Sequence, residues 1–125
     1  MHREILVKRF LLFLVLMGPQ LAHAQDLDAS QINEELVGRS ITWSDANGWA
    51  SGSLVLMPSG KAEITVTQPQ EASDAGQWTL DGNAICTAWN SMRQGLTKCY
   101  SVRETKPGHF VTSGGNEFEI RYFGV

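Results

Sequence analysis

The chain has 125 residues and carries ten Lys or Arg against thirteen Asp or Glu, a net charge of −3 at pH 7. Without Arg3, Lys8, Arg9 and Glu4, which lie in the first 24 residues, seven basic residues face twelve acidic ones, a net charge of −5. Such an acidic domain lacks the basic stripe that is typical of nucleic-acid-binding proteins. It is equally unsuited to electrostatic docking on an anionic membrane. We therefore expect no nucleic-acid partner.

The N-terminus has the order of residues of a signal peptide. Basic residues precede the apolar run 10–17, and Ala22-His23-Ala24 supplies the small residues that signal peptidase requires. The alternative is a transmembrane anchor, which needs roughly 20 apolar residues, but Gly18-Pro19 interrupts the run after about half that length. We expect cleavage after Ala24 and a bacterial periplasmic or secreted protein. Residues 25–125 would then form one domain with no membrane span in the mature form.

The pattern from residue 28 onward predicts one short helix followed by strands. Asp28 and Gln31 have the spacing of a capping box, Ile32 and Leu36 have helical spacing, and Gly38 ends the helix. The rest of the chain alternates with period two between turn residues. The predicted strands are residues 40–44, 51–57, 61–67, 76–80, 84–89, 97–104, 109–113 and 117–123, with 68–75 as a polar, mobile linker.

This arrangement predicts a mainly β fold. About eight strands in sequence favour an up-and-down antiparallel meander, closed or nearly closed into a barrel, because closure removes the exposed edges. With eight strands, side chains fill the interior or one small ligand just fits. The aromatic residues Trp78, Trp89, Phe118 and Tyr122 favour a filled interior.

Cys86 and Cys99 are the only two cysteines and predict a disulfide bond. An even pair in an exported protein favours this pairing, whereas a redox pair would use Cys-x-x-Cys and a zinc site would need further ligands. If the cysteines lie directly opposite in a hairpin, the bond lies on the outer face. The neighbouring pairs would then be Ile85–Tyr100, Thr87–Lys98, Trp89–Leu96 and Asn83–Val102.

No residue pattern predicts catalysis, a metal or a cofactor. His109 is the only histidine beyond residue 24, whereas a histidine-based metal site needs several and a catalytic triad needs a partnered serine. The aspartates lie in predicted turns and the glutamates alternate outward on strands, which is typical of a solvated surface. The chain also lacks a glycine-rich phosphate loop. We expect a protein that is not an enzyme.

Two segments are candidate sites for a partner, which we expect to be another exported protein. The loop 90–95 presents Met92, an adaptable apolar side chain, and Arg93, a residue type enriched at binding hot spots. Trp49 follows the Asn47-Gly48 turn and would be exposed at a barrel mouth. The alternative is that 90–95 is an ordinary solvated hairpin loop.

The runs Gly76-Gln77-Trp78, Cys86-Thr87-Ala88-Trp89 and Cys99-Tyr100-Ser101-Val102 resemble a group of small exported proteobacterial proteins, mainly from alphaproteobacteria. Leu36-Val37-Gly38 before a Trp-containing strand is similar too. That group is a domain family of unknown function. The resemblance implies a periplasmic location and a lipocalin-like β fold, and it implies no catalytic residues.

The chain also resembles, more weakly, the periplasmic inhibitors of secreted metalloproteases. These are β-barrels of similar size with a single disulfide and a Leu-x-Gly-x-x-Trp-like stretch. Here the two cysteines are closer together, and the inhibitory N-terminal arm is recognisable only as Gln25-Asp26-Leu27. The expected function is therefore a non-catalytic binding or inhibitor module. The alternatives are an envelope structural or stress-related protein without a specific ligand, and a periplasmic protease inhibitor.

Overall fold

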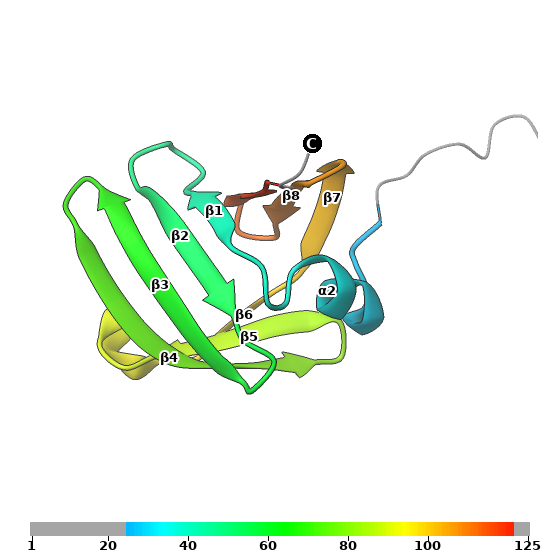
Figure 1. Ribbon diagram of the computed structural model, residues 1–125, viewed down its shortest axis with the longest axis horizontal. Coiled ribbons are helices and arrows are strands. Elements are labelled where there is room, and N and C mark those ends of the chain that lie inside the picture. Colours follow the sequence, from blue (N-terminus) through cyan, green and yellow to red (C-terminus); the bar gives the residue numbers. More distant parts are fainter. Residues whose placement is uncertain (1–24, 122–125) are drawn as a thin grey trace, which may run out of the picture.

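A computed structural model describes residues 25–121, in which one α-helix precedes a single antiparallel sheet (Figure 1). The predicted signal peptide lies outside the described residues, as do Tyr122 and Phe123 of the last predicted strand. No helix within residues 25–121 is long and apolar enough to cross a membrane. The elements are α2 (Ala29–Glu35), β1 (Ile41–Ser44), β2 (Ser51–Leu56), β3 (Lys61–Gln68), β4 (Ala72–Asp81), β5 (Ala84–Trp89), the 3-10 turn η1 (Met92–Gly95), β6 (Lys98–Tyr100), β7 (Val102–Lys106), β8 (His109–Thr112) and β9 (Glu117–Ile120).

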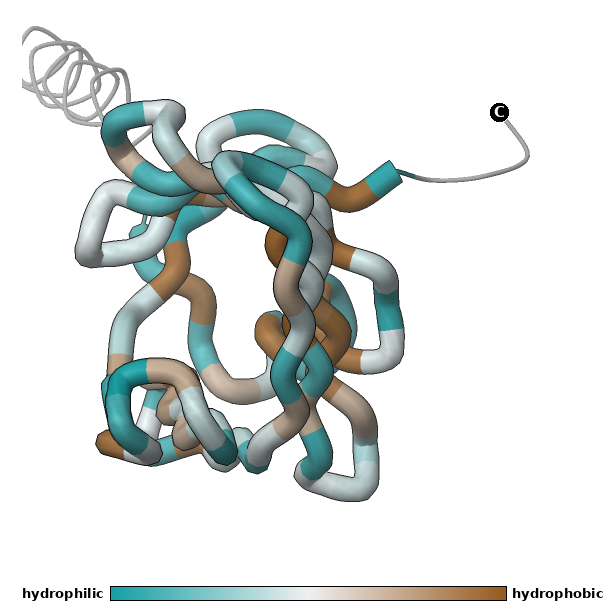
Figure 2. The backbone as a smooth tube through the Cα atoms, turned by 90° about the vertical axis from the view of Figure 1, so that its left-hand side faces the viewer, coloured by the Kyte–Doolittle hydropathy of each residue, from teal (hydrophilic) through white to brown (hydrophobic). Residues whose placement is uncertain are grey.

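The strands form an up-and-down meander that is nearly closed into a barrel, as the sequence predicts. Their order in the sheet is β6-β5-β4-β3-β2-β1-β9-β8-β7, and the first strand pairs with the last, Trp43 lying opposite Phe118. Figure 2 shows the backbone running around this ring. Pairing β1 with β9 removes two free edges, which would otherwise invite association with other chains.

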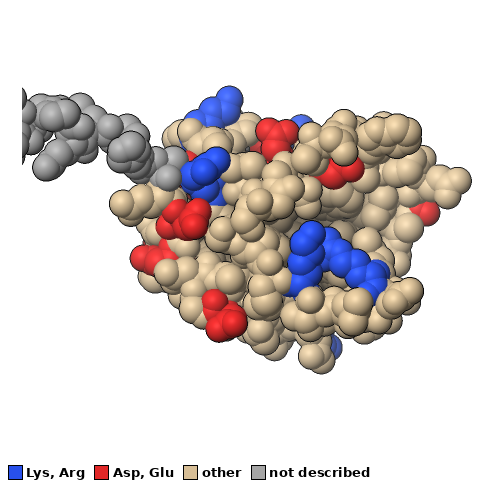
Figure 3. All heavy atoms as spheres, turned by 180° about the vertical axis from the view of Figure 1, so that it is seen from behind, with Lys and Arg blue, Asp and Glu red and all other residues tan. Residues whose placement is uncertain are grey.

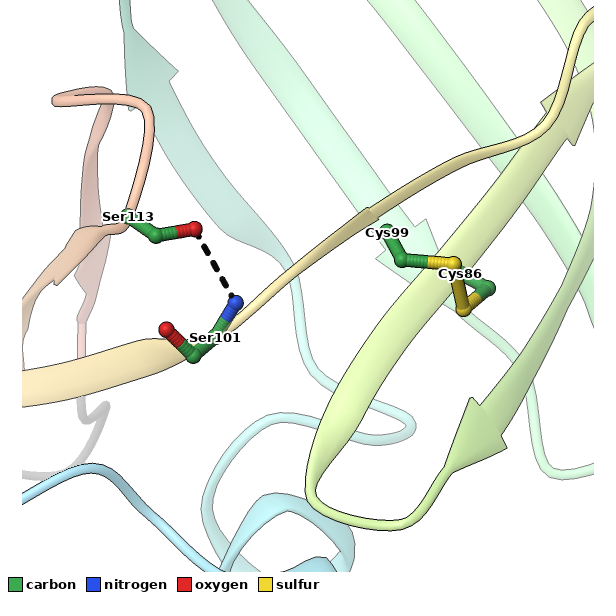
Figure 4. The surroundings of a disulfide bond; sticks show 4 residues. All are labelled: Cys86, Cys99, Ser101 and Ser113. Carbon is green, nitrogen blue, oxygen red and sulfur yellow. Dashed lines mark hydrogen bonds between the residues drawn. A yellow bond between two sulfur atoms is a disulfide. The ribbon is translucent and has the colours of Figure 1, made fainter.

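The sheet does not close by strand pairing between β6 and β7, its two edge strands, and we call this place the β6–β7 seam. Ser101 alone connects the two strands along the chain. The sequence predicts one strand here, residues 97–104, but Ser101 divides it, so that β6 pairs with β5 and β7 pairs with β8. The Ser101 N–H donates to the Ser113 hydroxyl group (3.2 Å), and the Ser113 N–H donates to the Ser101 carbonyl (2.9 Å) (Figure 4). The one predicted strand is thus split into β6 and β7, so the described residues form nine strands instead of eight, and the architecture is unchanged.

The Cys86–Cys99 disulfide is present, and it joins directly opposed residues of β5 and β6 (Figure 4). The predicted pairs Ile85–Tyr100 and Thr87–Lys98 are confirmed. The pairs Trp89–Leu96 and Asn83–Val102 are wrong, because β6 spans only three residues. Leu96 is 66% exposed in the loop before β6, and Val102 pairs instead with Thr112 of β8.

The predicted mobile linker 68–75 is also wrong for most of its length. Strand β4 begins at Ala72 and extends the predicted strand by four residues, which pair with β3 from Val66 to Glu63. These residues, Ala72 to Ala75, are small or polar, and all four are exposed or half-buried. Low hydrophobicity therefore reflects an exposed strand end here, not a loop.

Helix α2 and its flanks close one end of the barrel. The capping box is confirmed: the Asp28 carboxylate accepts from the Gln31 N–H (2.8 Å), and the Asp28 N–H donates to Gln31 Oε1 (2.9 Å). Ile32 and Leu36 are fully buried in the core. The Ala29 N–H also donates to Asn83 Oδ1 in the β4–β5 turn, which holds the helix against this end.

In an up-and-down meander, successive loops lie at alternating ends of the barrel. The loops that do not lie at the end closed by α2 therefore lie at the opposite end. There lie residues 45–50, 69–71, 90–97 and 113–116, and Figure 1 shows the first three together, away from α2. A Cβ atom on Gly115 would lie 3.1 Å from Ala46 Cβ, so the 45–50 and 113–116 turns are neighbours. We call this end, which no helix covers among the described residues, the open end.

Candidate functional site

A cavity of about 120 Å³ lies inside the open end of the barrel. An apolar cavity of about 150 Å³ in another protein is large enough to bind benzene, so this one has the size of one ring or a short aliphatic chain. Its walls come from seven strands, from η1 and from the β8–β9 turn. They are formed by Trp43, Leu54, Ile64, Thr87, Trp89, Met92, Arg93, Lys98, Tyr100, Thr112, Gly114, Asn116 and Phe118.

The deep part of the cavity is apolar and rigid. Leu54, Trp89 and Phe118 are each at most 6% exposed and belong to the core, as the sequence predicts for the two aromatic residues. The Tyr100 ring meets the Phe118 ring edge-on, with 6.1 Å between their centroids. The sequence left a filled interior and room for one small ligand as alternatives, with the aromatic residues favouring the first, and the cavity at the open end agrees with the second.

Trp43 lines the cavity, and backbone groups hold its ring in place. Its indole N–H lies 3.2 Å from the Ser53 carbonyl and 3.3 Å from the Thr65 carbonyl, so both oxygens accept from it and fix the ring over β2 and β3. Gly52, the cross-strand partner of Trp43, has no room for a side chain, since a Cβ atom there would lie 1.7 Å from the Thr65 carbonyl oxygen. The indole is thus held against the wall by backbone groups.

The loop 90–95 forms one rim of the cavity, and Asp74 holds it in place. One Asp74 carboxylate oxygen accepts from the Met92 N–H (2.8 Å) and the Ser91 N–H (2.9 Å), and the other accepts from the Ala75 N–H (2.8 Å). The hydrogen bonds from Met92 and Ser91 lower the pKa of Asp74. The carboxylate is therefore ionised at neutral pH and ties the loop to β4.

The three predicted partner-binding residues lie at the same end of the barrel, but they differ in exposure. Trp49 is 75% exposed, as predicted. Met92 is half-buried against the core and lines the cavity, so its role in binding a partner stays a prediction. Arg93 is exposed and also lines the cavity, with a left-handed backbone (φ 54°).

Further lining residues were not predicted as site residues. Thr87 and Lys98 are cross-strand partners and alternate with the disulfide, which lies on the other face of β5 and β6. That alternation was available in the sequence and could have placed Lys98 on the inner face. Gly114 and Asn116 come from the β8–β9 turn, and their approach to β6 depends on closure of the barrel.

The Tyr100 hydroxyl group remains neutral inside this site. Burial raises the pKa of Tyr100 well above its ordinary value, and the positive charge of Arg93 opposes that rise. Tyr100 can therefore donate a hydrogen bond at any physiological pH. Thr87 and Thr112 are the other residues with hydroxyl groups among those that line the cavity.

His109 lies away from the cavity. Its Nδ1 atom is 4.0 Å from the Glu119 carboxylate, while the Ser113 hydroxyl group is engaged at the β6–β7 seam. Within residues 25–121, no three His, Cys, Asp or Glu side chains are grouped so that they could hold a metal ion. The residues that line the cavity supply rings, hydroxyl groups and two cations. Comparisons with known proteins add nothing to this description, since no protein-family model, no curated protein and no solved structure matches the chain.

Proposed function

We propose that this protein is an exported, non-catalytic binding module that takes one small organic molecule into the open end of its barrel. The observation that carries the proposal is the cavity of about 120 Å³, with aromatic and aliphatic walls and a polar mouth. Concave, mostly apolar sites with a few polar groups are the usual form of small-molecule sites. The disulfide bond supports export, because such bonds persist in oxidising compartments.

The walls explain why such a site would be largely pre-formed. The indole of Trp43 is held by two carbonyl groups, Trp89 and Phe118 belong to the core, and the loop 90–95 is tied down by Asp74. Little conformational entropy is lost when a ligand enters a site whose walls are already ordered.

The test uses benzyl alcohol, a neutral ring that fits the volume, and follows amide chemical shifts of the oxidised protein. Shifts should change for residues lining the cavity and saturate. Ile64→Trp places a larger ring in the cavity and should abolish these changes. Val55→Trp is the matched control, because Val55 faces outward on the neighbouring strand and does not line the cavity. If benzyl alcohol shifts no cavity residue, or shifts them equally in the Ile64→Trp variant, the proposal is wrong.

A second candidate is binding of another exported protein at the same end. One observation favours it: Trp49 and Leu96 are the exposed large apolar side chains among residues 25–121, and both lie on open-end loops. Tryptophan is among the residue types enriched at binding hot spots.

A further inference from the structure

The charges around the cavity differ from those of the whole domain. Among the residues that line it are two basic side chains, Arg93 and Lys98, and no acidic one. The chain from residue 25 onward holds twelve acidic residues against seven basic ones, once Arg3, Lys8, Arg9 and Glu4 are set aside. Figure 3 shows acidic side chains spread over the face it displays, several separate basic side chains, and one place where basic side chains lie side by side. The mouth is thus positive in a negatively charged domain.

Neither cation is neutralised by the protein. Within residues 25–121, neither Arg93 nor Lys98 forms a salt bridge with a carboxylate. The carboxylate of the nearby Asp74 accepts three backbone N–H groups instead. Both positive charges therefore remain available to an anion at the mouth.

Lys98 reaches across the mouth toward the β8–β9 turn. Its ammonium nitrogen lies 4.0 Å from the position that a Cβ atom on Gly114 would occupy, and the Thr112 hydroxyl group lies 3.9 Å from the same point. Because Gly114 carries no side chain, the space in front of the ammonium group is open.

Arg93 lies at the mouth in a backbone conformation that residues other than glycine rarely adopt. Arg93 (φ 54°) and Gln94 (φ 56°) adopt two consecutive left-handed conformations, which are uncommon for residues other than glycine. Such strain persists where surrounding contacts fix it, and it is concentrated at functional sites. Here the Gln94 N–H donates to the Ser91 carbonyl and the Leu96 N–H donates to the Arg93 carbonyl, while Asp74 holds the Ser91 and Met92 N–H groups just before them.

We propose that the cavity selects an organic anion: a single carboxylate on an aromatic ring or a short aliphatic chain. The carboxylate lies at the mouth between Arg93 and Lys98, and the apolar part enters the chamber of Leu54, Trp89 and Phe118. The inference rests on the proposed binding function and adds the charge of the ligand. Arginine suits this role because its planar guanidinium group matches the two oxygens of a carboxylate.

Three probes of the same ring and different charge test the proposal: benzoate, benzyl alcohol and benzylammonium. Dissociation constants are measured by amide chemical-shift titration at pH 7 and low salt. Benzoate should bind about tenfold more tightly than benzyl alcohol, the difference expected from one charge-assisted hydrogen bond. Benzylammonium should bind no more tightly than benzyl alcohol, and added salt should weaken only benzoate.

Gly114→Asp tests the position of the anion. The new Cβ atom would make ordinary contacts at 3.9 and 4.0 Å, and its carboxylate would lie beside the Lys98 ammonium group and compete with the ligand. The preference for benzoate should be lost, while Gly114→Asn, of nearly the same shape and without the charge, should keep it. Equal binding of benzoate and benzyl alcohol, or an unchanged preference in Gly114→Asp, overturns the anion site and leaves the proposed function standing. Failure of all three probes to bind removes both.

Discussion

Removing the Cys86–Cys99 bond should destabilise the domain and loosen one wall of its cavity. The cysteines are 13 residues apart, and closing a loop of this length lowers the entropy of the unfolded chain by an amount worth about 3 kcal/mol. For a domain of roughly 100 residues, each 1 kcal/mol corresponds to about 4–8 °C in melting temperature. The Cys86→Ala/Cys99→Ala variant should therefore melt about 12–24 °C lower.

The effect on the cavity follows from the position of β6. This strand spans three residues and has β5 as its paired neighbour, and it carries Lys98 and Tyr100 into the cavity. Without the covalent link, the end of the sheet should fray on this side. Benzoate binding should then weaken together with stability.

The assay is urea unfolding of three samples: oxidised wild type, wild type reduced by dithiothreitol, and the double alanine variant. The reduced wild type keeps both sulfur atoms, so it separates the loss of the bond from the small cavity that alanine leaves at Cys86, which is 7% exposed. Both altered samples should lose about 3 kcal/mol of unfolding free energy. A loss below about 1 kcal/mol in the reduced wild type would refute the reasoning.

Two further predictions concern Tyr100 and Trp49. Since burial raises the pKa of Tyr100, the unfolded chain releases this proton at lower pH than the folded protein, so the contribution of Tyr100 to stability should be constant below about pH 10 and fall as pH rises above about 10. Absorbance titration of a Tyr122→Phe variant, which leaves Tyr100 as the only tyrosine, should show ionisation of the phenol only when the domain unfolds. Reversible ionisation of Tyr100 near pH 10, the usual value for tyrosine, while the domain stays folded would contradict this. Trp49→Ser should change the free energy of unfolding by less than about 0.5 kcal/mol, because the side chain is 75% exposed. If an exported protein docks at the open end, the same variant should lose that partner in a pull-down from a periplasmic extract, and an unchanged set of partners would speak against this docking.

The local features of the fold could be predicted because short-range rules determine them. The capping box at Asp28, the alternation of Ala62, Ile64 and Val66 in β3, and the direct opposition of Cys86 and Cys99 depend on neighbours along the chain or across one hairpin. Where prediction failed, a distant contact decided the outcome. Strand β4 begins at Ala72 although its first residues are polar, since β3 continues alongside it.

The cavity depends on contacts between residues that do not belong to the same hairpin. Lys98 and Gly114 meet because the barrel closes, and Met92 turns inward because Asp74, 18 residues earlier, holds its N–H group. In the sequence, Asp74 has the properties of an ordinary polar residue in a linker. The loop 90–95 was therefore identified as a candidate for binding, but its inward orientation was not.

The two ends of the barrel differ in burial, which separates the residues that stabilise the fold from the proposed binding site. At the end covered by α2, Ile32, Leu36, Leu56 and Val102 are fully buried, so truncation there should cost about 2–5 kcal/mol each for the larger side chains. At the open end, the cations and turn residues that line the cavity are exposed or half-buried, and substitutions of exposed side chains rarely change stability by more than about 0.5 kcal/mol. The mouth can consequently change its charge and shape while the covered half keeps the barrel folded. A ligand preference located at Arg93, Lys98 and Gly114 is therefore separable by mutation from the fold that supports it.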